Sequence, residues 1–239
     1  MQASADLLLL GQFHYAELLG AYGAAMKILS IPMGVVFALM STVYPKLAKH
    51  SHDFKSESLL TLMGATTRLI WVFVVPMVVG TFFFGDQLIL WFFGQSYQAS
   101  SAFLTPLSIA MAFFFLGLPP MVAILLSHNV KLMMKTSGLN LSVSFLCSFF
   151  VLLGGKPLLL PWAMVFSQGF FLVFTWLPFG KAGYFDGEDL RSLTLGAFLM
   201  AGGLLLPVSP ALKFSAAVAG YLLGLAFSKI WRRPWIKLF

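Results

Sequence analysis

The residue in this chain best suited to bind a charged ligand is a lysine inside a long apolar run. Lys27 lies within the apolar stretch from residue 18 to residue 44. Ionisable side chains at such a depth are costly in lipid, and they usually point to the interior of a helix bundle or to a water-filled cavity. We therefore interpret Lys27 as a cation that lines a passage for an anionic substrate. The alternative is a lysine that reaches the membrane interface or pairs with Glu17 or Asp6.

Around a helix at 100° per residue, small and bulky residues separate onto opposite faces of this stretch. The face of Lys27 carries mostly small residues: Ala16, Gly20, Gly23, Ala24, Ser30, Ile31, Gly34, Ala38 and Ser41. The opposite face carries bulky residues: Leu18, Tyr22, Leu29, Met33, Val36 and Met40. A face of small residues lets helices approach closely or leaves open volume. We therefore expect Gly23, Ser30 and Gly34 to line a transport cavity together with Lys27, toward the bundle interior.

Two further ionisable residues lie in or beside apolar runs. Arg68 shares a helical face with Glu57, Thr61 and Gly64 and lies about ten residues into the next run. We favour an interfacial arginine there, and the alternative is a second cation at the inner mouth of the cavity. Asp6 is the only acid inside an apolar run. Because intramembrane acids can carry coupling protons or sodium ions, Asp6 is a candidate for ion coupling.

Patterns typical of metal or enzymatic chemistry are missing from the sequence. His50 and His52 form a His-x-His pair with no further His or Cys nearby, which is too few ligands for a metal. Cys147 is the only cysteine, so neither an intrachain disulfide nor a thiolate cluster is expected. The eight acids are scattered and do not form the carboxylate pair that acid–base chemistry needs. We predict no catalytic residue, no cofactor and no metal, and hence a protein that is not an enzyme.

The composition excludes a water-soluble fold. Apolar residues make up 59% of the 239 residues and charged residues only 10%, and the mean hydropathy is +0.91. Soluble domains carry about 45–50% apolar and about 25% charged residues. A soluble enzyme, a secreted domain and a disordered chain are therefore excluded. Apolar runs such as residues 113–116 do not alternate with polar residues, which favours helices over a β-barrel.

We predict an all-α, polytopic membrane helix bundle of about seven transmembrane helices, since a span needs about 20 apolar residues. The expected spans are residues 18–44, 60–84, 101–126, 137–154, 157–179, 192–208 and 211–230. Prolines are frequent in or near these spans, and each interior proline leaves a carbonyl that neighbouring helices must satisfy. They are Pro32, Pro76, Pro106, Pro119, Pro120, Pro161 and Pro178.

Basic residues separate by side if these seven spans alternate in direction. Lys156 and Lys213 fall on one side, Lys27 lies inside the first span, and the other twelve of the 15 share the opposite side. These twelve are Lys46, Lys49, Lys55, Arg68, Lys131, Lys135, Lys181, Arg191, Lys229, Arg232, Arg233 and Lys237. Lys and Arg concentrate in cytoplasmic loops. We therefore predict a multi-pass protein of the cytoplasmic (inner) membrane with a cytoplasmic C-terminus, and the net charge of +7 does not indicate nucleic-acid binding.

Several short motifs occur in a characteristic order: residues 6–13, 20–27, 44–48, Pro76 with Gly80, and 92–99. In this order they resemble the C-terminal half of polysaccharide and lipid-linked oligosaccharide flippases of the multidrug/oligosaccharidyl-lipid/polysaccharide (MOP) superfamily. The second motif, Gly20-x-Tyr22-x-x-Ala25-x-Lys27, is similar to the family's opening of the eighth helix. The resemblance covers about residues 3–180.

The resemblance implies a MATE-like transporter fold, in which two pseudo-symmetric lobes of six helices enclose a cavity with alternating access. Residues 1–17 would be the end of a preceding transmembrane helix and residues 18–180 the C-terminal lobe. Residues 181–239 would add a cytoplasmic loop, two extra helices and a basic cytoplasmic tail. The first lobe would then be missing, and this chain alone is not expected to transport.

The implied function is the flipping of polyprenyl-pyrophosphate-linked oligosaccharide across the cytoplasmic membrane for polysaccharide biosynthesis. Expected partners are the lipid-linked oligosaccharide, membrane lipids and either an N-terminal lobe or polysaccharide assembly proteins, with no nucleic acid. Two alternatives remain open. One is a membrane-embedded enzyme of glycan or lipid assembly, and the other is an inactive structural membrane fragment.

Overall fold

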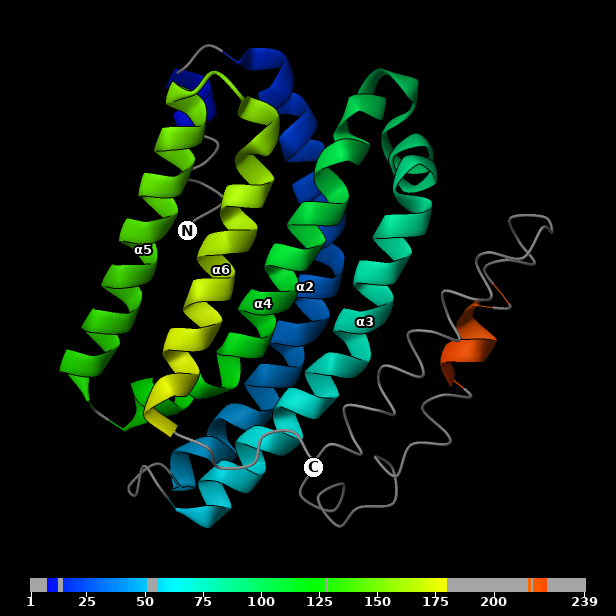
Figure 1. Cartoon of the computed structure of the whole chain (residues 1–239). Helices are drawn as coiled ribbons and strands as arrows, with labels where there is room; N and C mark the ends of the chain where they lie inside the picture. The colour runs from blue at the N-terminus through cyan, green and yellow to red at the C-terminus, as the bar shows by residue number, and fades with distance from the viewer. Residues whose placement is uncertain are drawn as a thin grey trace.

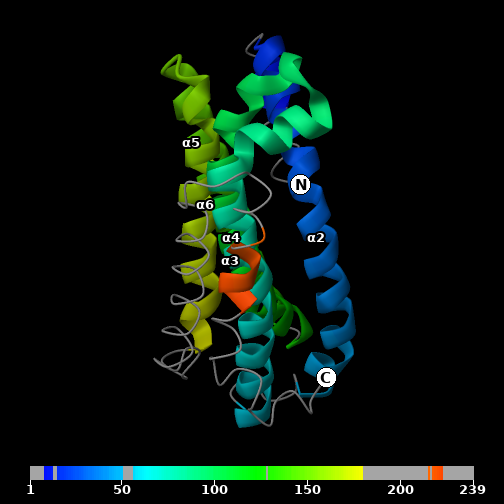
Figure 2. The same ribbon diagram turned by 90° about the vertical axis from the view of Figure 1, so that its right-hand side faces the viewer.

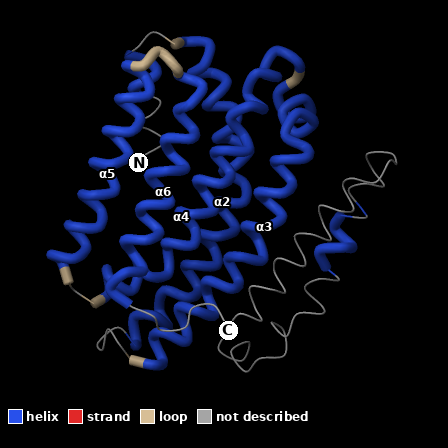
Figure 3. Tube along the Cα trace, viewed as in Figure 1, coloured by secondary structure: helices blue, strands red, loops and turns tan. Residues whose placement is uncertain are grey.

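A computed structural model of the chain describes residues 8–12, 15–50, 56–127, 129–179, 215 and 217–222. In this described part every regular element is a helix (Figure 3). Five of the helices are long and apolar enough to cross a membrane. They run alternately up and down, side by side, and form one elongated bundle (Figure 1).

The long helices are α2 (Ala16–His50), α3 (Glu57–Phe93), α4 (Ser101–Leu126), α5 (Val130–Leu153) and α6 (Leu160–Trp176). Three short 3-10 turns adjoin them: η1 (Gln95–Ser100), η2 (Pro157–Leu159) and η3 (Leu177–Phe179). Five of the seven expected spans are thus confirmed as apolar helices of spanning length. Expected span 192–208 lies outside the described residues, and of span 211–230 only residues 215 and 217–222 are described, as helix.

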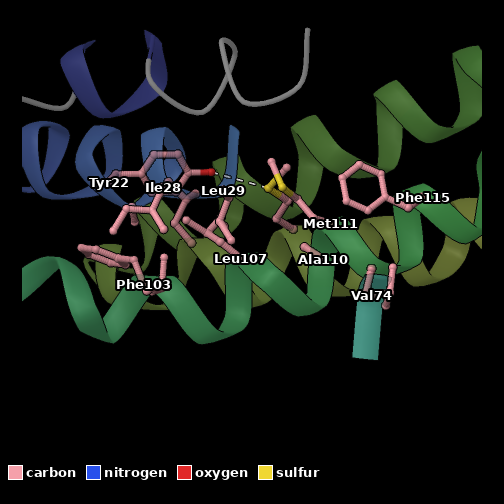
Figure 4. Close-up of a cluster of buried hydrophobic side chains, with 14 of the residues drawn as sticks. Tyr22, Ile28, Leu29, Val74, Phe103, Leu107, Ala110, Met111 and Phe115 are labelled. Carbon is pink, nitrogen blue, oxygen red and sulfur yellow. Dashed lines mark hydrogen bonds between the residues drawn. The ribbon is translucent and has the colours of Figure 1, made fainter. Parts of the chain in front are cut away.

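Helix α4 lies in the middle of the bundle. Figure 2 shows α2 along one side and α5 and α6 along the other, with α4 between them. Tyr22 of α2 is fully buried against α4, with its ring centroid 6.1 Å from that of Phe103. Its hydroxyl donates to Met164 Sδ of α6 at 3.5 Å, drawn as the dashed line in Figure 4. Tyr22 therefore links three helices through the core.

Two of the interior prolines show how the bundle satisfies the carbonyls they leave. Pro120 has no N–H to donate to the carbonyl of Leu116, four residues earlier. Trp176 Nε1 of α6 donates to that oxygen at 3.2 Å. Pro76 likewise leaves the carbonyl of Val72, which accepts a hydrogen bond from the Tyr221 hydroxyl at 2.8 Å. In both cases a side chain from another segment replaces the lost backbone donor, as expected for helices in lipid.

Hydroxyl groups join α3 to α4. Thr81 Oγ1 and Ser108 Oγ, both buried, lie 2.7 Å apart. Thr105 Oγ1 donates to the carbonyl of Thr81 at 3.3 Å. Small hydroxyl residues at a helix interface allow close approach and add hydrogen bonds between helices. The contact fixes the height of α3 against α4.

Candidate substrate-facing surface and its relatives

The two faces of α2 lie in different environments. Leu29 and Val36, on the bulky face, are each only 1% exposed. Lys27, Ser30 and Gly34, on the small face, are exposed. The sequence pattern thus separates the surface that packs in the core from the surface that stays open. Two residues expected on the open face depart from this, since Ala24 is buried and Gly23 is half-buried.

Lys27 points away from the core of the described bundle. It lies eleven residues into α2, about 16 Å along the axis at 1.5 Å per residue. No other described residue forms an ion pair with it, including the exposed Glu17, and Asp6 lies outside the described residues. Any cavity that Lys27 lines therefore has its second wall outside the described bundle.

Hydroxyl groups along α2 donate hydrogen bonds to carbonyls of the same helix. Ser30 Oγ donates to the carbonyl of Lys27 at 2.6 Å. Farther along, Ser41 Oγ donates to Ala38 O and Thr42 Oγ1 to Leu39 O, both at 2.8 Å. A hydroxyl bonded back to its own helix avoids the cost of an unpaired polar group in an apolar setting. The Lys27 ammonium, in contrast, still needs water or a counter-charge.

Part of the flippase-like motif at residues 20–27 is structural. Tyr22 and Ala25 are fully buried, whereas Gly20 and Lys27 are exposed. The motif therefore spans two faces of α2. Its tyrosine contacts α4 and α6, its alanine is buried in the core, and its glycine and lysine remain on the open face.

The structure does not bring Arg68 to Lys27. Each residue lies about eleven residues from the start of its helix, and α2 and α3 run in opposite directions with lengths of 35 and 37 residues. The two cations are therefore at different heights in the bundle. Arg68 is half-buried, with Gly64 buried and Glu57 and Thr61 exposed on the same helix.

Metal ligands do not gather in the described part of the chain: no group of three or more His, Cys, Asp or Glu could hold an ion there. Asp6 and His52 lie outside the described residues. Cys147, in α5, is a free thiol.

The structure also shows a cavity that the sequence interpretation missed. A cavity of about 580 Å³ lies where α2 ends and α3 begins. It is lined by Lys46, Lys49, His50, Glu57, Ser58, Thr61 and Leu62. The signal was the i, i+3, i+4 spacing of Lys46, Lys49 and His50, which places all three on one helical face. From the sequence alone, Lys46 and Lys49 indicated only which side of the membrane this end of the chain faces.

Comparison with known proteins gives two matches. A family model described as "Polysaccharide biosynthesis protein" matches residues 1–102. A solved structure, "Lipid II flippase MurJ, inward closed conformation", matches with a TM-score of 0.73. Identity is 15%, and the match covers 91% of this chain and 48% of that one. The chain shares the fold of that flippase over the matched residues. A search of curated proteins finds no significant sequence match.

These matches confirm the resemblance to polysaccharide and lipid-linked flippases, and they confirm the all-α membrane bundle. Together with the five apolar helices, they make the chain a multi-pass membrane protein. The chain spans about half the length of the solved flippase. At 15% identity the structural likeness establishes the fold alone. The cargo, the direction of transport and the division of the chain at residues 17 and 180 remain predictions.

Proposed function

We propose that this chain forms one wall of a transporter that flips a polyprenyl-pyrophosphate-linked oligosaccharide for polysaccharide biosynthesis. The observation that carries the proposal is the open face of α2, where Lys27 lies among small residues and outside the core. The flippase-like fold and the polysaccharide biosynthesis match support it. No bond is made or broken in this process, so the chain acts as a transporter and not as an enzyme.

The Lys27 ammonium costs free energy if it faces lipid. A lysine deep in a membrane is stable where it meets water or a counter-charge, and lipid offers neither. A second wall against α2 would enclose a wet passage and give the ammonium access to an anionic group. Lysine suits a transporter because its compact charge with three donors binds a phosphate without the fixed fork of arginine. Gly23, Ser30 and Gly34 would leave volume beside it.

The second wall would come from an N-terminal lobe, and transport would follow from rocking of the two lobes about the cavity. Five of the seven described basic residues lie on the expected cytoplasmic side, at or toward the end that holds the α2–α3 and α4–α5 connections: Lys46, Lys49, Arg68, Lys131 and Lys135. By the positive-inside rule we assign that end to the cytoplasm of the inner membrane. Substrate would then move from the cytoplasmic to the outer leaflet. Reporter fusions after His50 that reported the outside would contradict this assignment.

The central test is removal of the Lys27 charge. The chain would be co-expressed with a flippase N-terminal lobe in a flippase-null strain, and complementation would be measured beside membrane abundance. We expect Lys27→Leu to abolish or greatly reduce complementation at near-normal abundance, because the phosphate loses its cation. Lys27→Arg should keep partial function. Lys156→Leu is the matched control, since it removes a lysine from a loop, and it should complement like the parent.

Transport by Lys27→Leu at the parent's rate would contradict the assignment of this residue. Cysteine labelling tests the geometry separately, in a background where Cys147 is replaced by serine. Cysteines introduced at Lys27 and Gly34 should react with a small water-soluble thiol reagent in the co-expressed complex, whereas cysteines at Leu29 and Val36 should not. Equal reaction at all four positions would contradict a water-filled passage along the open face even if Lys27→Leu were inactive.

A further inference from the structure

The cavity between the end of α2 and the start of α3 has the chemistry of a phosphate site. Lys46 and Lys49 bring two ammonium groups, His50 a ring N–H, and Ser58 and Thr61 two hydroxyls. Its volume of about 580 Å³ lies within the range of small-ligand sites, about 300–1,000 Å³. Cations and hydroxyls from two converging helices are the donors that a phosphate group accepts.

The local backbone holds these donors in place. Ser56 caps α3, because its side chain accepts from Leu59 N at 3.3 Å. The Ser56 hydroxyl also reaches His50 O, at 3.4 Å, and so joins the last turn of α2 to the first turn of α3. Ser58 Oγ lies 3.4 Å from Ser56 Oγ in the same cluster. The cavity is thus formed by two helix ends tied to each other.

The residues around the cavity are those expected at the level of lipid phosphates. Lys46 and Lys49 follow directly on the apolar run of α2, and Tyr44, just before them, is exposed. Tyrosines and lysines at the ends of a spanning helix mark the boundary between acyl chains and headgroups. A cavity at this height opens to headgroups rather than to acyl chains.

We propose that the α2–α3 cavity, defined by Lys46, Lys49, His50, Glu57, Ser58 and Thr61, binds a phosphate group carried by a lipid. The site is separate from the open face of α2, because Lys27 lies 19 residues before Lys46, about five helical turns away. The proposal needs only that the helices span a membrane and does not depend on transport. Either an anionic membrane lipid or a polyprenyl diphosphate has the required chemistry.

A simpler explanation also exists for each charge. Lys49 and His50 end α2 and Glu57 begins α3, which is the arrangement that stabilises helix dipoles without any ligand. Glu57 also lines the cavity and would repel a phosphate. These points give the two explanations opposite consequences. If the cavity binds phosphate, neutralising Glu57 raises its affinity for the lipid. If the charges only stabilise the helix dipoles, the same change leaves lipid binding unaltered.

The experiment uses the full chain purified in a neutral detergent, with lipid binding measured by native mass spectrometry. Probes are phosphatidylglycerol, a polyprenyl diphosphate, the zwitterionic phosphatidylcholine and inorganic phosphate. We expect K46Q/K49Q to weaken binding of at least one anionic lipid about thirtyfold, and K49Q alone about fivefold. E57Q should tighten it several-fold. The single variants remain informative if the double variant folds poorly.

The matched control is K131Q/K135Q, which removes two lysines from the start of α5 at the same end of the bundle but outside the cavity. It should change binding by less than about twofold, because neither lysine lines the cavity. An equal loss in both double variants would overturn the site, since it would indicate general surface attraction. Unchanged binding in K46Q/K49Q would overturn it as well. Inorganic phosphate binding as tightly as the lipids would overturn the claim that the phosphate is lipid-borne.

The two anionic lipids distinguish the source. Preference for phosphatidylglycerol would assign the cavity to bulk lipid, and preference for polyprenyl diphosphate would assign it to the carrier. Failure of the Lys27 test leaves this experiment unaffected, because lipid binding is measured without transport.

Discussion

Helices α4 and α2 differ in how far the rest of the chain covers them. The most apolar stretch of the segment that contains α4 is 61% buried, whereas that of α2 is 33% buried. Both are apolar enough to span a membrane, so hydropathy alone does not separate them. Exposed apolar residues are ordinary in lipid, which is as apolar as leucine. The distinction lies in what the exposed surface contains.

On α2 the exposed surface holds Gly34, Ser30 and Lys27 beside large apolar residues, and a lysine is costly against lipid. On α4, Gly117 and Ser108 are buried and make contacts with other helices. Gly117 packs against Phe171 of α6, and Ser108 lies against Thr81 of α3. Small residues on α4 therefore serve packing within the chain, whereas on α2 they leave a surface free for a second wall.

The largest expected effect comes from filling a glycine on each helix. A Cβ at Gly117 would lie 2.7 Å from Phe171 Cε1, and the Phe171 ring is 2% exposed and held by its neighbours. Overpacking of this kind costs about 1–3 kcal/mol. We expect Gly117→Ala to lower the unfolding free energy by that amount in detergent-based unfolding.

Gly34→Ala is the matched control on α2, where a Cβ would meet nothing within 4 Å. It should leave the unfolding free energy unchanged or raise it, because alanine favours helix over glycine. If Gly34→Ala destabilised the isolated chain as much as Gly117→Ala does, the open face of α2 would have to be packed, and the comparison would fail.

Much of this fold could be predicted from the sequence because lipid requires long apolar helices. The five described spans follow from run length and composition alone. The face of α2 that packs was also predictable, since Tyr22, Leu29 and Val36 repeat at helical spacing. What surrounds the opposite face could not be predicted, because periodicity separates two faces without saying which neighbour each one meets. Lys27 was expected toward the interior, and it faces out from the described bundle.

The α2–α3 cavity was missed for a related reason. From the sequence, Lys46 and Lys49 indicate the cytoplasmic side of the membrane. Their role in lining a cavity depends on Ser58 and Thr61 of α3, which lie beside them only in the folded chain. The side chains that donate to the carbonyls freed by proline could not be predicted from the sequence either. The sequence identifies the carbonyls of Leu116 and Val72 as needing donors, but Trp176 and Tyr221 lie 60 and 149 residues away.

The next effect tests whether α4 depends on neighbours for its backbone bonds. Trp176→Phe keeps a ring beside Phe179 but removes the donor to Leu116 O. We expect a loss of about 1 kcal/mol in unfolding free energy. In a Pro120→Ala background the new N–H can bond Leu116 O within the helix, so the same substitution should cost less. A double-mutant cycle with no coupling between positions 120 and 176 would show that the indole acts by packing alone.

The smallest expected effect comes from the hydroxyl pair between α3 and α4. Thr81 Oγ1 also lies 3.0 Å from Val78 O and Ser108 Oγ lies 2.7 Å from Thr105 O, so whichever hydroxyl does not donate to the other can donate within its own helix. Removing one hydroxyl therefore leaves the other satisfied, and the coupling energy should be about 0.6 kcal/mol, the average for such bonds in membranes. A cycle of Thr81→Val and Ser108→Ala measures it. Ser41→Ala on α2, whose hydroxyl bonds Ala38 O in the same helix, should change stability less than Ser108→Ala does. If Ser41→Ala cost as much, a hydroxyl on the open face of α2 would contribute as much as one between packed helices, and the contrast between α2 and α4 would not extend to their polar residues.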